Sequence, residues 1–154
     1  MEINHNHPAA TLYHLTEHDY GNQTHWAPKK FGRNRSPNEP QIPRICFSLS
    51  ITGCFLSLGD IANHYHKWHL YSTVGEYYQP NDLEVVDAPA AQEVWRLSPT
   101  ILTKKYSFSY QDRMRIKNHL YFSAGHPSAV KYQLHFKPKI EKILNQIFND
   151  RNQT

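Results

Sequence analysis

Three short segments carry the side chains whose chemistry is most specific. LYHLT holds His14, and RICFSLS begins at Arg44 and leads into an amphipathic stretch that ends at Tyr65. QEVW, further along the chain, holds Glu93. A carboxylate stabilises positive charge that develops on a reacting atom, and an aromatic face attracts a planar cation. No segment is specific alone, so the hypothesis depends on their order and on the elements that carry them.

Short runs of alternating or continuous apolar residues predict the strands. These runs cover residues 11–16, 45–48, 68–73, 93–97, 106–110 and 131–136. Residues 17–43 are rich in Gly, Asn and Pro and show no sustained period, so they predict one long loop. Loops of this length in compact domains are often functional.

Helical periodicity predicts two helices. The first follows Ser50, a candidate N-cap, and Gly59 weakens it and can end it early. Its apolar face consists of Ile51, Cys54, Phe55, Leu58, Ile61 and Tyr65. The second covers about residues 138–150, with Pro138 in its first turn. Together the elements predict an α+β single domain over residues 11–154 after a flexible N-terminus at residues 1–10. Its core is a split, mainly antiparallel β-sheet with few helices.

Length and composition bound the class of protein. The chain has 154 residues, enough for one domain with a real core. We expect a cytoplasmic protein with no membrane partner, because no stretch approaches the roughly 20 apolar residues of a membrane span and the N-terminus lacks an apolar signal core. In such a protein the two cysteines, Cys46 and Cys54, are expected to be buried thiols.

The order of these segments resembles that of the diphtheria-toxin-like ADP-ribosyltransferases, and its layout is most similar to the small rifampin ADP-ribosyltransferases. In that family a His follows an aromatic residue on the first core strand, as His14 follows Tyr13. A strand then leads through Ser or Thr into a helix, as residues 45–51 do. A Glu or another polar residue stands near a later strand, as Glu93 does. The likeness covers about residues 11–105.

The resemblance implies an enzyme that cleaves NAD, its substrate, and transfers ADP-ribose to an acceptor. The acceptor is left open among protein, nucleic acid and small molecule. By this resemblance His14 binds a ribose hydroxyl, Tyr65 stacks on the nicotinamide ring, and Glu93 holds the 2′-hydroxyl of the nicotinamide ribose. Asp82 and Asp87 are alternatives to Glu93, because the rifampin-modifying branch uses an Asp.

The remaining NAD contacts implied by the resemblance lie in the first half of the chain. Tyr13 precedes His14, and Ser48 or Ser50 would help to seat the nicotinamide ribose. The diphosphate needs positive charge or backbone donors, which Arg44 or the basic loop at residues 29–35 would supply.

A second hypothesis from another class is a binding module or small inhibitor without enzymatic activity. The formal net charge is +4, and the last third of the chain carries most of the Lys and Arg. Such a surface suits a nucleic acid or an acidic protein partner. The residues that interleave aromatic rings with positive charge are Tyr106, Phe108, Tyr110, Arg113, Arg115 and Lys117.

Histidines also raise the question of a metal site. His64, His66 and His69 form a His-x-His-x-x-His pattern. Metal sites need three or four convergent ligands, and neither a Cys pair at zinc spacing nor a His-Glu-x-x-His motif is present. We therefore expect no metal.

Overall fold

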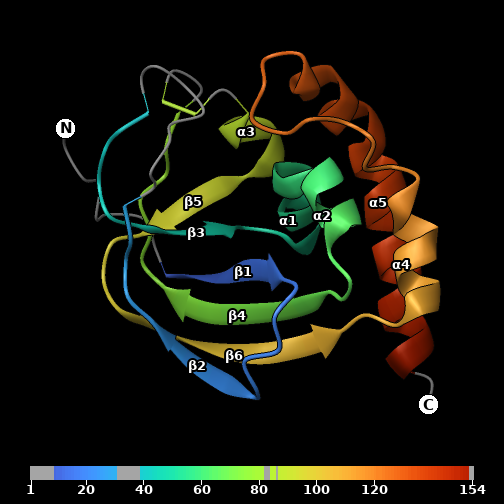
Figure 1. Cartoon of the computed structure of the whole chain (residues 1–154), viewed down its shortest axis with the longest axis horizontal. Coiled ribbons are helices and arrows are strands. Elements are labelled where there is room, and N and C mark those ends of the chain that lie inside the picture. The colour runs from blue at the N-terminus through green and yellow to red at the C-terminus, as the bar shows by residue number, and fades with distance from the viewer. Residues whose placement is uncertain (1–8, 31–38, 82–83, 86, 153–154) are drawn as a thin grey trace.

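One antiparallel sheet and five helices make up the described part of the chain (Figure 1). The structure, a computed structural model, describes residues 9–30, 39–81, 84–85 and 87–152. The strands are β1 (Ala10–Thr16), β2 (Gln23–Trp26), β3 (Ile45–Ser48), β4 (His69–Gly75), β5 (Glu93–Arg96) and β6 (Thr100–Ser107). The helices are α1 (Ile51–Leu58), α2 (Asp60–His64), α3 (Ala88–Ala91), α4 (Tyr110–Lys117) and α5 (Ala129–Asn152).

The sheet is split between β1 and β3. Its strand order is β2-β6-β4-β1-β3-β5, and all neighbours run antiparallel. β1 pairs with β4 along its whole length, and β3 does the same with β5. β1 and β3, however, share a single registered pair, Tyr13 with Ser48. The predicted α+β fold with a split antiparallel sheet is therefore confirmed.

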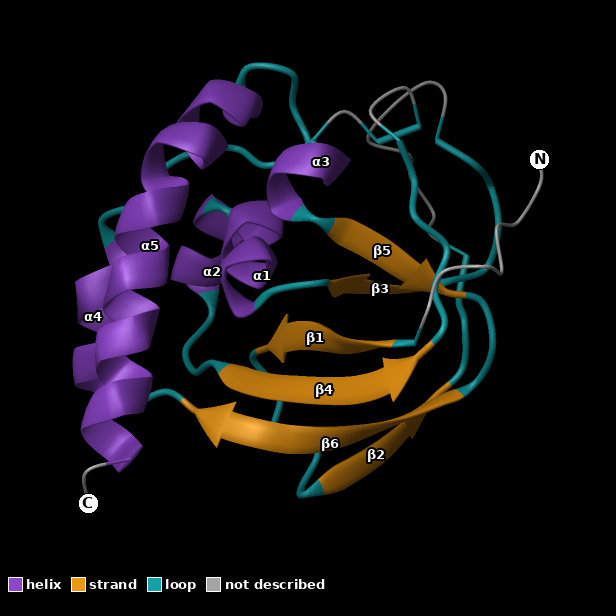
Figure 2. Cartoon of the chain, turned by 180° about the vertical axis from the view of Figure 1, so that it is seen from behind, coloured by secondary structure: helices purple, strands orange, loops and turns teal. Residues whose placement is uncertain are grey.

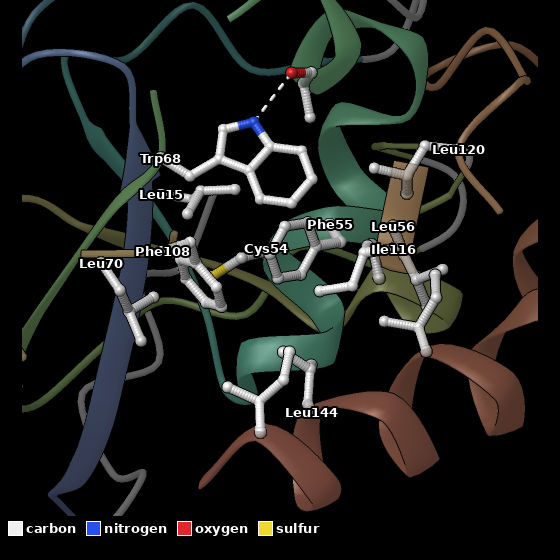
Figure 3. Close-up of a cluster of buried hydrophobic side chains, with 14 of the residues drawn as sticks. Leu15, Cys54, Phe55, Leu56, Trp68, Leu70, Phe108, Ile116, Leu120 and Leu144 are labelled. Atoms are coloured by element: carbon white, nitrogen blue, oxygen red, sulfur yellow. Dashed lines mark hydrogen bonds between the residues drawn. The ribbon is translucent and has the colours of Figure 1, made fainter. Parts of the chain in front are cut away.

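The helices gather at one end of the strands, where β1, β3 and β6 end and β4 and β5 begin (Figures 1 and 2). The largest apolar cluster fills the space between this end of the sheet and the helices, as Figure 3 shows. Trp68 and Phe55 pack edge to face at its centre, with ring centroids 4.9 Å apart. The Trp68 indole Nε1 donates to the Ala62 carbonyl at 2.9 Å, so its buried polar atom is satisfied.

A smaller cluster packs around the middle of the strands. Its buried members are Leu12, Ile45, Phe47, Tyr71, Val94 and Leu102. Trp26, from β2, packs against it. Its members come from both sides of the division between β1 and β3, so the two halves of the sheet pack within one domain.

Capping explains where α1 begins and ends. The Ser50 hydroxyl accepts from the Gly53 amide at 3.0 Å, which confirms the predicted N-cap of α1. Gly59 ends α1 with a φ of 56°, a conformation that glycine adopts readily. A second helix, α2, begins at Asp60, so the predicted amphipathic stretch forms two helices.

Several predicted elements are corrected. Residues 106–110 are not one strand, because β6 ends at Ser107 and a capping box of Ser109 and Asp112 starts α4. Residues 131–136 are helical, since α5 begins at Ala129 and contains Pro138 in its interior. The long loop includes β2. In the described ranges, no helix combines the length and the apolar character that a membrane span requires.

Candidate functional site

A cleft of about 650 Å³ lies against the β1–β3 split. β1 and β3 line it together with Glu93 at the start of β5, and the segment around β2 forms its outer wall. Two backbone hydrogen bonds between Lys29 and Arg44, at 3.0 and 3.2 Å, hold that wall to the start of β3. Tyr71 ties the other end, because its hydroxyl accepts from the Tyr20 amide and donates to the Gly21 carbonyl, both at 2.8 Å.

His14 faces this cleft in one defined protonation state. Its Nδ1 lies 2.9 Å from the Cys46 carbonyl oxygen, which only accepts, so Nδ1 carries the proton. Burial lowers the pKa of His14, and the Cys46 hydrogen bond opposes that shift in part. The imidazole is therefore neutral near pH 7, and Nε2 keeps its lone pair. Trp26 packs edge-on against the ring, with centroids 4.7 Å apart.

Glu93 lines the same cleft from the opposite half of the sheet. It opens β5 directly across from Ser48 and is 4% exposed. Its Oε2 accepts from the Trp95 indole Nε1 at 2.8 Å. Gln92, just before it, has a φ of 56°, and its Oε1 accepts from the Ser50 hydroxyl at 2.6 Å. This left-handed backbone conformation is rarely populated, and the hydrogen bond of the Gln92 side chain holds it just before β5 begins.

Tyr13 and Ser48 also lie in the lining of the cleft. The Ser48 hydroxyl donates to the Ala91 carbonyl at 2.8 Å, so its proton is committed to holding α3. It also accepts from the Ser50 amide at 3.3 Å. The Ser48 hydroxyl therefore uses its hydrogen bonds to stabilise the local fold.

Two of the predicted NAD contacts lie outside the cleft lining. Ser50 belongs to a separate, smaller pocket beside α5. Tyr65 follows α2 and packs against the helical core. Burial, followed by the nearby Glu17 carboxylate, raises the pKa of the Tyr65 phenol.

Arg44 lines the cleft, but its guanidinium is held within the wall. It forms a buried ion pair with Glu39 and donates to the Pro40 carbonyl at 2.7 Å. It also lies 4.1 Å above the Trp95 ring. The geometry assigns Arg44 to the support of the wall. Lys29 is an exposed cation among the described residues that line the cleft. Residues 31–35 of the basic loop lie outside the described residues.

Asp87, one of the two alternative acids, is not in the cleft lining. Asp82 lies outside the described residues. Asp87 is buried beneath α3 and accepts from the Gly125 amide at 2.8 Å and from Gln133 Nε2 at 2.9 Å. These bonds give Asp87 a structural role. Among the described residues, Glu93 and Glu39 are the acids that line the cleft with His14, and Glu39 forms the ion pair with Arg44.

Sequence reasoning missed Trp26 and Trp95 as neighbours of the site. Trp26 lies in the stretch predicted to be a loop, where no periodicity marks it. Trp95 did carry a signal, because residues two apart in a strand share one face, which places Trp95 beside Glu93.

The structure describes the surroundings of both cysteines and of His69. Cys46 and Cys54 are both free thiols; Cys54 is buried as expected, whereas Cys46 is half-buried. Burial raises the pKa of the Cys54 thiol to about 12, so this sulfur is unreactive near neutral pH. His69 is buried and its Nδ1 pairs with the Ser107 hydroxyl at 2.8 Å. Among the described residues no group of three His, Cys, Asp or Glu is placed to hold a metal ion.

Comparisons with models of known protein families, with curated proteins and with solved structures find no match.

Proposed function

We propose that the protein cleaves NAD in this cleft and transfers ADP-ribose to an acceptor. The observation that supports the proposal best is the convergence of His14 and Glu93 on one cleft from the two halves of a split sheet. The resemblance in segment order to ADP-ribosyltransferases supports the same function. Each residue alone has ordinary structural explanations, whereas their joint position in a cleft of about 650 Å³ suits a dinucleotide-sized ligand.

The two residues have distinct roles in this reaction. With Nδ1 committed to Cys46, His14 Nε2 accepts a hydrogen bond from a ribose hydroxyl. The Glu93 carboxylate holds the 2′-hydroxyl of the nicotinamide ribose and stabilises the positive charge that develops on its anomeric carbon. The bond from that carbon to the nicotinamide nitrogen breaks, and its electron pair leaves with nicotinamide. The acceptor, or water, forms the new bond and loses a proton.

The outer wall supplies the other contacts. Trp26 and Tyr20 pack edge-on, with centroids 5.4 Å apart, and both line the cleft. We assign to this aromatic wall the stacking role that the resemblance gives to Tyr65. Lys29, exposed at the cleft, provides the positive charge for the diphosphate in place of Arg44.

Titration of NAD into the protein by calorimetry tests the assignment of the cleft. His14→Asn keeps a donor toward Cys46 but lacks the Nε2 acceptor, so we expect it to weaken NAD binding about tenfold, the value of one hydrogen bond to a polar ligand. Tyr65→Phe, outside the cleft lining, is the control and should bind as the wild type does. Absence of saturable binding in the wild type, or equal effects of the two substitutions, would contradict the proposal.

A second candidate, a nucleic-acid-binding module, is favoured by a stripe on α5. Lys131, His135, Lys139 and Lys142 recur every three or four residues and are all exposed, so they form one basic face. The surface predicted from residues 106–117 is corrected, because Tyr106 and Phe108 are buried.

Salt dependence tests this second candidate. Binding of a mixed-sequence oligonucleotide, followed by fluorescence anisotropy, should weaken as salt rises, because each neutralised phosphate releases counterions. Replacing Lys131, Lys139 and Lys142 with Gln should weaken binding and flatten that slope. Affinity that does not change with salt, or with these substitutions, argues against nucleic-acid binding at α5.

A further inference from the structure

The environment of Trp95 links the acidic residue of the cleft to a buried ion pair. Trp95 is fully buried, and its indole Nε1 donates to Glu93 Oε2 at 2.8 Å. The Arg44 guanidinium lies 4.1 Å over one side of the same indole. Tyr78 stacks against Trp95 at 5.4 Å between ring centroids, with 25° between the ring planes.

This arrangement holds the indole in place from several directions. Trp95 and Tyr78 also exchange two backbone hydrogen bonds of 2.8 Å, so the stacked rings are fixed by their main chains. Arg44 is fixed in turn by its ion pair with Glu39 and by the Pro40 carbonyl. A ring with so little freedom aims its N–H in one direction, toward Glu93.

The Trp95 indole supplies one hydrogen bond to the buried Glu93 carboxylate. A hydrogen-bond donor stabilises a carboxylate more than a carboxylic acid. A cation over an indole is attracted by the negative face of the ring, and its field makes the ring N–H a stronger donor.

We propose that Trp95, in contact with both Arg44 and Tyr78, is the positioning residue that aims the Glu93 carboxylate into the cleft. The proposal rests on the proposed function for its consequence in catalysis, and on the contacts of Trp95 for its geometry. The proposal makes Arg44 a support for the Trp95 ring. The sequence had suggested instead that Arg44 contacts the diphosphate.

The chain contains three tryptophans, so the indole N–H region of a ¹⁵N–¹H spectrum isolates the contact. On titration to acid, the Trp95 signal should move as the Glu93 carboxylate takes up a proton, and Glu93→Gln should abolish that movement. Trp68, whose Nε1 bonds to Ala62, is the internal reference and should not follow Glu93. A Trp95 signal that titrates identically in Glu93→Gln, or stays fixed in the wild type, would overturn the proposal. This readout does not require NAD turnover.

Kinetics then test the catalytic consequence. Trp95→Phe keeps an aromatic ring but removes the N–H, and should lower kcat for nicotinamide release roughly ten- to hundredfold with little change in KM, as expected for a misaimed group. Trp68→Phe is the matched control, because it removes an equally buried, hydrogen-bonded indole outside the cleft. Equal loss of kcat in both variants would overturn the positioning role, whereas a wild type without turnover contradicts the proposed function instead.

Discussion

At the scale of single residues, the hydrogen bond of His14 to the Cys46 carbonyl explains most about the site. β1 and β3 share one registered pair, and an imidazole donor reaches the carbonyl of the neighbouring strand. One side chain therefore both links the two half-sheets and leaves a ring nitrogen as acceptor in the cleft. The sequence identified His14 as a candidate, but the Cys46 partner depends on strand pairing that no local pattern specifies.

Acid should destabilise the protein through His14. Burial holds its pKa below the ordinary value of 6.5, so below about pH 6.5 the unfolded chain binds a proton that the folded chain does not. The free energy of unfolding should therefore fall as pH decreases from about 6.5 toward the folded pKa. Burial lowers the pKa of His69 and His119 in the same direction, so they add to the effect.

Urea unfolding at about pH 7.5 and about pH 5.5 measures this dependence. The loss of unfolding free energy on acidification should be smaller in His14→Asn, which cannot titrate, than in the wild type. An equal loss in the two proteins would assign the acid sensitivity to other groups.

At the scale of elements, the close approach of α1 to β3 and α3 shapes the helical wall of the cleft. A Cβ at Gly53 would lie 2.0 Å from Ser48 Oγ and 2.2 Å from the Ala91 carbonyl oxygen. The first turn of α1 can therefore sit this close only with glycine at that position.

Gly53→Ala should lower the free energy of unfolding by about 1–3 kcal/mol, because the backbone must move apart. Helix propensity alone predicts the opposite sign, a gain of up to about 1 kcal/mol. Asn149→Ala, at an exposed position of α5, is the control and should change stability by less than about 0.5 kcal/mol. Chemical denaturation of the three proteins decides between the two signs.

Gln133 joins α5 to the rest of the fold. Its Nε2 donates to the Leu56 carbonyl and to Asp87 Oδ2, each at 2.9 Å, in a fully buried position. Gln133→Leu should lower the free energy of unfolding by about 1–3 kcal/mol, because it leaves a buried carboxylate and carbonyl without this donor.

The control for Gln133 is Gln146→Leu, on the same helix, where the amide oxygen meets Arg115 at an exposed site. That change should cost less than about 0.5 kcal/mol. Thermal or urea unfolding that shows equal losses for both substitutions would mean that the buried bonds of Gln133 contribute no net stability.

Local rules predicted some elements and failed for others for physical reasons. The cap at Ser50 and the helix end at Gly59 depend on nearby residues, so sequence alone sufficed. The first half of α5 was predicted as a strand because Tyr132, Leu134 and Phe136 alternate with polar residues. Tertiary contacts of the buried Gln133 override that alternation.

At the scale of the whole molecule, the split sheet makes the candidate site possible. His14 belongs to the β1 half and Glu93 to the β3–β5 half, and the cleft lies against the division between them. The two residue types and their order were visible in the sequence. Long-range packing decides two further features, which the sequence alone does not reveal. These are the ion pair that holds Arg44 to Glu39 and the position of Tyr65 outside the cleft lining.

Release of nicotinamide from NAD, measured by chromatography for the wild type and Glu93→Gln, tests the central claim most directly. The substitution preserves the size of the side chain and removes its charge. We predict that the wild type releases nicotinamide and that Glu93→Gln still binds NAD but turns it over at least about a hundredfold more slowly, as when one transition-state electrostatic contact is lost. Equal rates in the two proteins would contradict the role of Glu93, and no release by the wild type with any acceptor class would contradict NAD cleavage in this cleft.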